Sequence, residues 1–329
     1  MLNRRVLMGL LLAVPLTPGV TAQPATAEPA PSVPTCMGKP ATIAGGVGTP
    51  GNDVFVASTD DFFVDAGAGD DLICIVGSPT GDIDDGVSID AGPGDDSILN
   101  EVGTYVSAVL GPGADRYIGG SDSDDVRAGW PGDQSRDYVR TRGGYDSLVL
   151  DAGRVDADLG RDRDEIIPVG AAHGRGTLDG GRGVDSVSTG YQIRGARIID
   201  DLRADLSSHV LRVNHARYKL TDVGDLYIRA RHLSLRGDGT PNNLVGWACS
   251  MDLWGGPGND HLAVGSTDSV LGRGLHCPLR SRQYGEAGND DLLGGHLADV
   301  LFGGSGRDIA RGKEGVDRCS AEKKWSCER

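Results

Sequence analysis

Aspartates recur at a fixed interval near the C-terminal end of the sequence. The stretch YGEAGNDDLLGGHLADVLFGGSGRDIARGKEGVDRC, residues 284–319, carries Asp290, Asp299, Asp308 and Asp317, nine residues apart each time. Glycines around them leave the backbone free to turn and to point its carbonyls inward. Carboxylate and carbonyl oxygens are the ligands that a hard cation such as Ca²⁺ prefers. The spacing therefore indicates a cation site that is repeated along the chain.

The same nine-residue unit occurs over most of the sequence. The last four units start at Gly285, Gly294, Gly303 and Gly312, and each has glycine first, aspartate sixth and an apolar or small residue eighth. Upstream units place Asp71, Asp96, Asp115, Asp124 and Asp260 sixth, and looser copies surround Asp53, Asp146, Asp164 and Asp185. The three residues that close each unit are long enough only for a short strand, with one side chain inside and its neighbours outside.

Two units form one coil of a flattened solenoid, a turn and strand out followed by a turn and strand back. Aspartates that stand two units apart should then stack, namely Asp53 with Asp71, Asp146 with Asp164, Asp290 with Asp308, and Asp299 with Asp317. Carboxylates on strands about 4.8 Å apart repel by about 0.9 kcal/mol even at the dielectric constant of water. A divalent cation between them would remove this repulsion. The other role open to these aspartates is the capping of turns, and for Asp185 both roles stay open.

The consensus GGxGxDxUx, carried by units such as AGAGDDLIC (66–74) and GGPGNDHLA (255–263), resembles the hemolysin-type calcium-binding (RTX) repeats over roughly residues 43–319. The overall plan is similar to small secreted actinobacterial calcium-binding proteins. This resemblance implies an all-β fold, a right-handed parallel β-roll or β-solenoid, with Ca²⁺ between successive coils. The implied ligands are turn carbonyls and the aspartates Asp53, Asp71, Asp96, Asp115, Asp124, Asp146, Asp164, Asp260, Asp290, Asp299, Asp308 and Asp317. Replacements such as Leu297, Asp122 and Asn242 leave the number of occupied sites open.

The N-terminal segment is expected to be a secretory signal peptide, because two arginines precede the apolar run VLMGLLLAVPL, which is too short to span a bilayer. Cleavage is expected after Ala22 or Ala27, and Arg4-Arg5 leaves the twin-arginine route open beside the general one. We divide the chain into a signal peptide (1–27), a leader or N-terminal cap (28–42), repeats (43–190), a segment of longer coils (191–236), repeats (237–319) and a C-terminal cap (320–329). A small separate β domain is the alternative for 191–236.

Six cysteines suit an oxidising compartment and allow 15 pairings. Distant segments of an elongated repeat do not meet, so pairing between sequence neighbours is favoured. We therefore expect disulfides Cys36–Cys74, Cys249–Cys277 and Cys319–Cys327. A zinc site is the alternative, although the sequence contains no CxxC pair.

Composition and motifs restrict the function. A net charge of −15 favours cations as partners and argues against nucleic acid and anionic lipid. We expect a secreted, extracellular monomer without a membrane span. HExxH, GxSxG and GxxxxGK motifs are absent, so a non-catalytic calcium-binding protein is the first interpretation. The alternative is a polysaccharide-acting β-helix enzyme or a module for carbohydrate or cell-surface adhesion, which a row of exposed aromatic and basic residues along one sheet face would favour.

Overall fold

The described part of the chain is built from strands alone. The computed structural model describes residues 33–43, 46–58, 63–76, 86–169, 173–189, 199–265 and 280–328, in which 29 strands and no helix occur. The expected signal peptide lies outside the described residues. Contacts divide the chain into Met1–Val33 and Pro34–Arg329, and the second unit contains all of the strands. Among the described residues no helix is long and apolar enough to cross a membrane.

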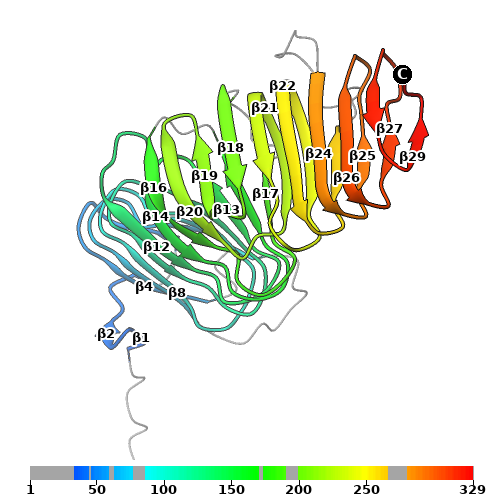
Figure 1. Ribbon diagram of the computed structural model, residues 1–329. Coiled ribbons are helices and arrows are strands. Elements are labelled where there is room, and N and C mark those ends of the chain that lie inside the picture. Colours follow the sequence, from blue (N-terminus) through cyan, green and yellow to red (C-terminus); the bar gives the residue numbers. More distant parts are fainter. Residues whose placement is uncertain are drawn as a thin grey trace, which may run out of the picture. The chain divides into compact units, whose positions relative to one another are not determined.

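Strands of successive coils lie side by side in two long rows, which we call the first and the second sheet and which two longer strands join into one 27-stranded sheet (Figure 1). The first sheet contains, in order of pairing, β4 (Val54–Ser58), β6 (Leu72–Val76), β8 (Ser97–Asn100), β10 (Arg116–Ile118), β12 (Arg136–Arg140), β14 (Gly153–Asp158), β16 (Gly174–Asp179), β20 (Ala216–Thr221), β19 (Val210–Val213) and β18 (Asp201–Asp205). The second sheet contains β3 (Gly46–Val47), β5 (Phe63–Asp65), β7 (Val87–Asp90), β9 (Val106–Val109), β11 (Asp124–Ala128), β13 (Ser147–Leu150), β15 (Glu165–Pro168) and β17 (Ser186–Ser188). The fold is the all-β solenoid that the repeats predict.

Two long strands, β21 (Asp225–Arg236) and β22 (Asn243–Pro257), each belong to both sheets. The first residues of β21 pair with β17 of the second sheet, and its last residues pair with β18 of the first. The next strand, β22, pairs with β21 along both parts. Beyond it, the first sheet continues with β24 (Arg280–Gly288), β26 (Val300–Gly306) and β28 (Arg318–Ser320), and the second with β23 (His261–Val264), β25 (Asp291–Leu293), β27 (Ile309–Arg311) and β29 (Lys323–Trp325).

The core lies between the two sheets and is made by alternate residues of each strand, since side chains of a strand point to opposite faces in turn. In β11, for example, positions 124, 126 and 128 are buried and the two between them are exposed. Equivalent positions of neighbouring coils lie in register: Ile73, Ile98, Tyr117 and Val139 form one column on β6, β8, β10 and β12. All four are at most 3% exposed. One apolar residue per short strand is therefore enough to build a continuous core.

Coil length varies more than the nonapeptide predicts. The strands that follow Asp53 and Asp71 pair two repeat units apart, as expected, but the coil that leads from Arg116 to its neighbour Tyr138 is longer than two units. In that longer coil the extra residues include a turn in which the amide of Asp133 donates to the carbonyl of Trp130 over 3.1 Å. An insertion in a turn leaves the strand register intact, because the strands on either side still pair in parallel.

Residues 199–236 contribute strands to the same two sheets. Here β19 pairs antiparallel with both β18 and β20, and β18 pairs in parallel with β21. The loss of the glycine turns in this part of the sequence coincides with a β-meander that replaces a simple coil. The residues 190–198 that precede it lie outside the described part.

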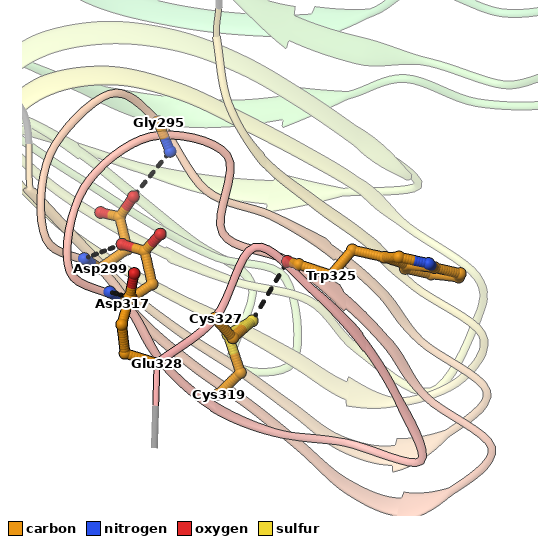
Figure 2. Close-up of a disulfide and its surroundings, with 7 residues drawn as sticks. All are labelled: Gly295, Asp299, Asp317, Cys319, Trp325, Cys327 and Glu328. Carbon is orange, nitrogen blue, oxygen red and sulfur yellow. Dashed lines mark hydrogen bonds between the residues drawn. A yellow bond between two sulfur atoms is a disulfide. The ribbon is translucent and has the colours of Figure 1, made fainter.

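Disulfides close both ends of the described solenoid. Cys36 and Cys74 are bonded, as are Cys319 and Cys327 (Figure 2), so two of the expected pairs are confirmed. Cys249 is also disulfide-bonded, and Cys277, its expected partner, lies outside the described residues. The first bond ties a short antiparallel pair, β1 (Thr35–Cys36) and β2 (Lys39–Pro40), to β6 of the first sheet.

Replacing Gly306 with alanine should destabilise the solenoid by about 2 kcal/mol or more, because φ is positive there and a Cβ would meet the backbone of the preceding coil. The φ angle is +143°, and the added atom would lie 1.6 Å from the carbonyl oxygen of Gly288. Gly239→Ala is the matched control, since nothing lies within 4 Å of its Cβ position. Chemical denaturation of both variants measures the difference; equal stabilities would contradict this account of the turns.

Candidate functional site

The aspartates singled out from the sequence are buried side chains placed just before a strand or at its first residue. Asp71, for example, precedes β6, and Asp290 precedes β25. Asp53 is 7% exposed, and the other predicted ligands, Asp71, Asp96, Asp115, Asp124, Asp146, Asp164, Asp260, Asp290, Asp299, Asp308 and Asp317, are at most 2% exposed. Carboxylates are almost never fully buried without a partner. The arrangement of their partners therefore decides what they do.

The buried carboxylates form columns, which we call aspartate ladders, in which each coil is hydrogen-bonded to the next. The backbone N–H of one ladder residue donates to Oδ1 of the equivalent residue in the following coil. The first sheet contains four such bonds in succession. They run from Asp53 to Asp71 over 2.7 Å, from Asp71 to Asp96 over 2.8 Å, from Asp96 to Asp115 over 2.9 Å and from Asp115 to Asp137 over 3.2 Å. A charge-assisted bond of this kind is stronger than a neutral one, so the ladder aligns the coils.

The remaining ladders follow the same rule. On the second sheet Asp124, Asp146 and Asp164 donate to Asp146, Asp164 and Asp185 over 2.8, 2.9 and 2.8 Å. Further along that sheet the backbone N–H groups again donate to Oδ1 of the next ladder residue. These bonds run from Asn242 to Asp260 over 2.9 Å, from Asp260 to Asp290 over 2.9 Å and from Asp290 to Asp308 over 3.0 Å. On the first sheet Ser281 and Asp299 donate to Asp299 and Asp317 over 2.7 and 2.9 Å. All four pairs expected to stack are thus neighbours in a ladder.

Several ladder residues escape the sequence pattern. Two glutamates end the ladders: Glu322 Oε2 accepts from the amide of Asp308 over 2.8 Å, and Glu328 Oε2 accepts from Asp317 over 2.5 Å (Figure 2). They stand 14 and 11 residues after their donors, in the shortened last coil, where no spacing signal exists. Asp137 does not match the 18-residue spacing, because it follows Asp115 by 22 residues. Ser281 does match it, since it precedes Asp299 by 18 residues, and the spacing could have predicted its place in the ladder.

The second carboxylate oxygen divides the ladder into two kinds of position. In Asp53, Asp137 and Asp299 it accepts the backbone N–H of Thr49, Gly129 and Gly295 over 2.8, 2.7 and 2.6 Å, so it caps a turn. Elsewhere Oδ2 is buried and has no hydrogen-bond partner among the described residues: this holds for Asp71, Asp96, Asp115, Asp124, Asp146, Asp164, Asp185, Asp260, Asp290, Asp308 and Asp317. A buried unpaired carboxylate oxygen is costly and calls for a proton or a cation.

Where a unit begins with glycine, as at Gly119, Gly255, Gly285 and Gly312, the missing side chain leaves room beside that free oxygen. A Cβ at Gly285 would lie 2.3 Å from Oδ2 of Asp290 and 2.4 Å from the carbonyl oxygen of Gly303 in the next coil. At Gly312 the corresponding distances are 2.2 Å to Oδ2 of Asp317 and 2.1 Å to a backbone carbonyl oxygen. No side chain fits at this point, where a carboxylate oxygen and a carbonyl oxygen from two coils converge.

This donor set fits a hard cation, with a restriction. Oxygen atoms of both kinds are suitable for Ca²⁺, and the unpartnered Oδ2 atoms supply negative charge. Because Oδ1 already accepts an amide, most ladder aspartates with a free Oδ2 can offer one oxygen; Asp124, which has both oxygens unpartnered among the described residues, can offer two. Within the described ranges, no group of three or more His, Cys, Asp or Glu side chains could hold a metal ion. A calcium ion at a ladder would therefore take most of its ligands from turn carbonyls.

Burial makes these carboxyl groups poor acids. Desolvation, with repulsion from neighbouring carboxylates, raises the pKa of Asp115 and Asp164 to about 8 and of Asp96 to about 7. Burial likewise raises the pKa of Asp290 and Asp317 above the ordinary value. The same cause acts on Asp124, whose pKa rises to about 8, and on Asp146, Asp185 and Asp260, whose pKa rises to about 6. Without a cation, several ladder positions hold a proton at neutral pH.

Comparison with known proteins adds no assignment. No family model matches the chain, and a search of curated proteins found no match.

The calcium-free protein should lose stability as the pH rises from about 5 to about 8.5. A carboxyl group whose folded pKa is raised binds more protons in the folded than in the unfolded chain between the two values, so its contribution is complete at low pH and disappears as the pH passes the folded pKa. Thermal unfolding of calcium-stripped protein at the two pH values checks this. Asp164→Asn should reduce the slope; a melting temperature that rises with pH would contradict the raised pKa values.

Proposed function

We propose that the protein is a secreted, non-catalytic calcium-binding β-roll whose repeats are of the hemolysin-type (RTX) kind. The observation that carries this proposal is the column of buried Oδ2 atoms without partners, which at Asp124, Asp260, Asp290 and Asp317 lie beside a glycine and a carbonyl oxygen of the next coil. In the proposal, Ca²⁺ is held by Oδ2 of ladder aspartates such as Asp290 and Asp308 and by turn carbonyls such as that of Gly303.

Calcium is better suited than protons or magnesium to neutralise the ladder carboxylates. Protons neutralise a carboxyl group only where the pKa is near the ambient pH, whereas a divalent ion neutralises two carboxylates and takes six to eight oxygen ligands, carbonyls included. Magnesium requires a strict octahedron and keeps its water, which suits a site rich in backbone carbonyls less well. Extracellular calcium modules bind with Kd of about 10⁻⁴ to 10⁻³ M, and at a tenfold excess each site adds about 1.4 kcal/mol to stability.

Secretion is consistent with this role. The described residues contain two disulfides, Cys36–Cys74 and Cys319–Cys327, which persist in oxidising compartments. Outside the cell, calcium is abundant enough for millimolar sites. We propose that the chain is exported and that calcium stabilises the coils after export.

Removal of calcium should loosen the solenoid. In EGTA the β signal in circular dichroism should weaken and the melting temperature should fall, because the ladder charges lose their counterion; millimolar calcium should restore both. Magnesium at the same concentration is the control and should restore little. Identical spectra and melting temperatures in EGTA and in calcium would refute calcium-dependent folding.

An asparagine substitution separates the hydrogen-bonding role of the ladder from cation binding. Asp290→Asn keeps an Oδ1 that can accept the amide of Asp260, which now donates over 2.9 Å. It replaces the free oxygen by an N–H₂ group that can donate to a turn carbonyl, as Nδ2 of Asn242 does to Gly224 over 3.0 Å. We therefore expect the variant to be more stable than the wild type without calcium and less stable with it, by about 1 kcal/mol in each direction.

Calcium-dependent unfolding and the stoichiometry of bound calcium measure this reversal. Asp201→Asn, at an exposed position outside the ladders, is the matched control and should change neither quantity. If Asp290→Asn bound as much calcium as the wild type, the ladder would have only its hydrogen-bonding role.

A further inference from the structure

A row of arginines crosses the outward face of the first sheet. Strand pairing places Arg136 beside Arg154, Arg154 beside Arg175, Arg175 beside Arg217, Arg217 beside Arg212, and Arg212 beside Arg203. The strands are β12, β14, β16, β20, β19 and β18, which lie side by side (Figure 1). We call these six residues the arginine row. At a strand spacing of about 4.8 Å it extends for roughly 24 Å.

The row is unfavourable for the fold alone. Like charges directly opposite one another on neighbouring strands destabilise a sheet, and the row contains five such contacts in succession. Only its two ends are balanced: Arg136 pairs with Asp156 over 3.0 Å and Arg203 with Asp205 over 3.6 Å. Within the described residues the four central arginines have no ion pair, although the protein carries 47 acidic residues.

Exposure makes the central arginines accessible. Arg175, Arg212 and Arg217 are exposed, and Arg154 is half-buried. The Nε atom of Arg154 is enclosed and has no hydrogen-bond partner in the described part of the chain. Guanidinium groups form paired hydrogen bonds with carboxylate and sulfate groups, so a regular row of them suits a ligand with a regular row of anionic groups.

The same face continues with aromatic residues. Next to Asp205 of β18 lie, in register, Arg236, Trp254, Tyr284 and Phe302 on β21, β22, β24 and β26. The rings of Trp254 and Tyr284 are stacked, with centroids 6.0 Å apart and an interplanar angle of 13°, and Phe302 is 48% exposed. Flat apolar rings can contact the C–H faces of sugars. Basic and aromatic residues in rows on one sheet face favour the binding of carbohydrate.

We propose that the arginine row binds a linear anionic polysaccharide, with one guanidinium group for each sugar. The strand spacing of about 4.8 Å is close to the length of one sugar unit in an extended chain. Nucleic acid fits less well, because its phosphates recur about every 3.4 Å along the axis of a duplex strand. The row lies on the outward face of the sheet and the aspartate ladders lie in the turns, so the two sites are separate.

The test uses the full chain and a chondroitin sulfate dodecasaccharide, which has an anionic group on every sugar, at constant calcium concentration. The triple variant Arg175→Ser, Arg212→Ser, Arg217→Ser should raise the Kd by about tenfold or more, since charge-assisted contacts are lost. The matched control, Arg127→Ser, Arg231→Ser, Arg307→Ser, removes the same charge elsewhere and should change the Kd by less than about threefold. The triple lysine variant at the row should bind with an intermediate Kd, because lysine keeps the charge but not the paired geometry.

Melting temperatures control for folding, and the row variant should melt no lower than the wild type because repulsion is relieved. Four outcomes would overturn the proposal: no binding by the wild type, equal weakening in both serine variants, equal binding of an uncharged maltooligosaccharide, or tighter binding of a DNA oligonucleotide or anionic vesicles. Calcium stoichiometry should be unchanged in every arginine variant, which separates a failure here from a failure of the calcium proposal.

Discussion

The structure depends on one interaction, the acceptance of a backbone N–H by a buried carboxylate of the next coil. It fixes the register of the turns, from the amide of Asp53 on Asp71 to the amide of Asp299 on Asp317. It uses only Oδ1, however, and leaves Oδ2 enclosed without a partner at most ladder positions that the structure describes. A carboxylate that is half satisfied stabilises a coil only if something neutralises its other oxygen. We infer the proposed calcium sites from these unpartnered Oδ2 atoms.

Strand pairing brings like charges together both in the turns and on the outward face of the first sheet. In parallel coils a residue type that recurs at one position of the repeat meets itself on the neighbouring strand. In the turns this produces the aspartate ladders. On the outward face of the first sheet, strand pairing that is partly antiparallel aligns arginines from unequal intervals into the arginine row. Each arrangement has unbalanced charge of one sign, and each therefore fits ions of the opposite sign: cations within the turns, anionic groups along the sheet. Neutral packing explains neither, since the columns are costly on their own.

The sequence predicted much of the fold and the ladder, because both are local properties of a nine-residue unit. Glycine turns, one apolar residue per strand and aspartates such as Asp290 and Asp308, two units apart, are readable without a structure. Residues that depend on coil length were missed. Asp137 follows a longer coil, and Glu322 and Glu328 belong to a shortened one. The arginine row was invisible for a related reason: its members are separated by unequal intervals and by the antiparallel strands β18 to β20, so only the strand pairing aligns them.

The most direct measurement is the anomalous difference density of crystals grown in calcium, collected at a long wavelength where calcium scatters anomalously. The account predicts peaks in the turns between Oδ2 of Asp290 and the carbonyl oxygen of Gly303, and at the equivalent places along the ladders. Ladder turns without anomalous peaks in abundant calcium, with the amide-to-Oδ1 bonds intact, would contradict it and leave the carboxylates as hydrogen-bond acceptors alone.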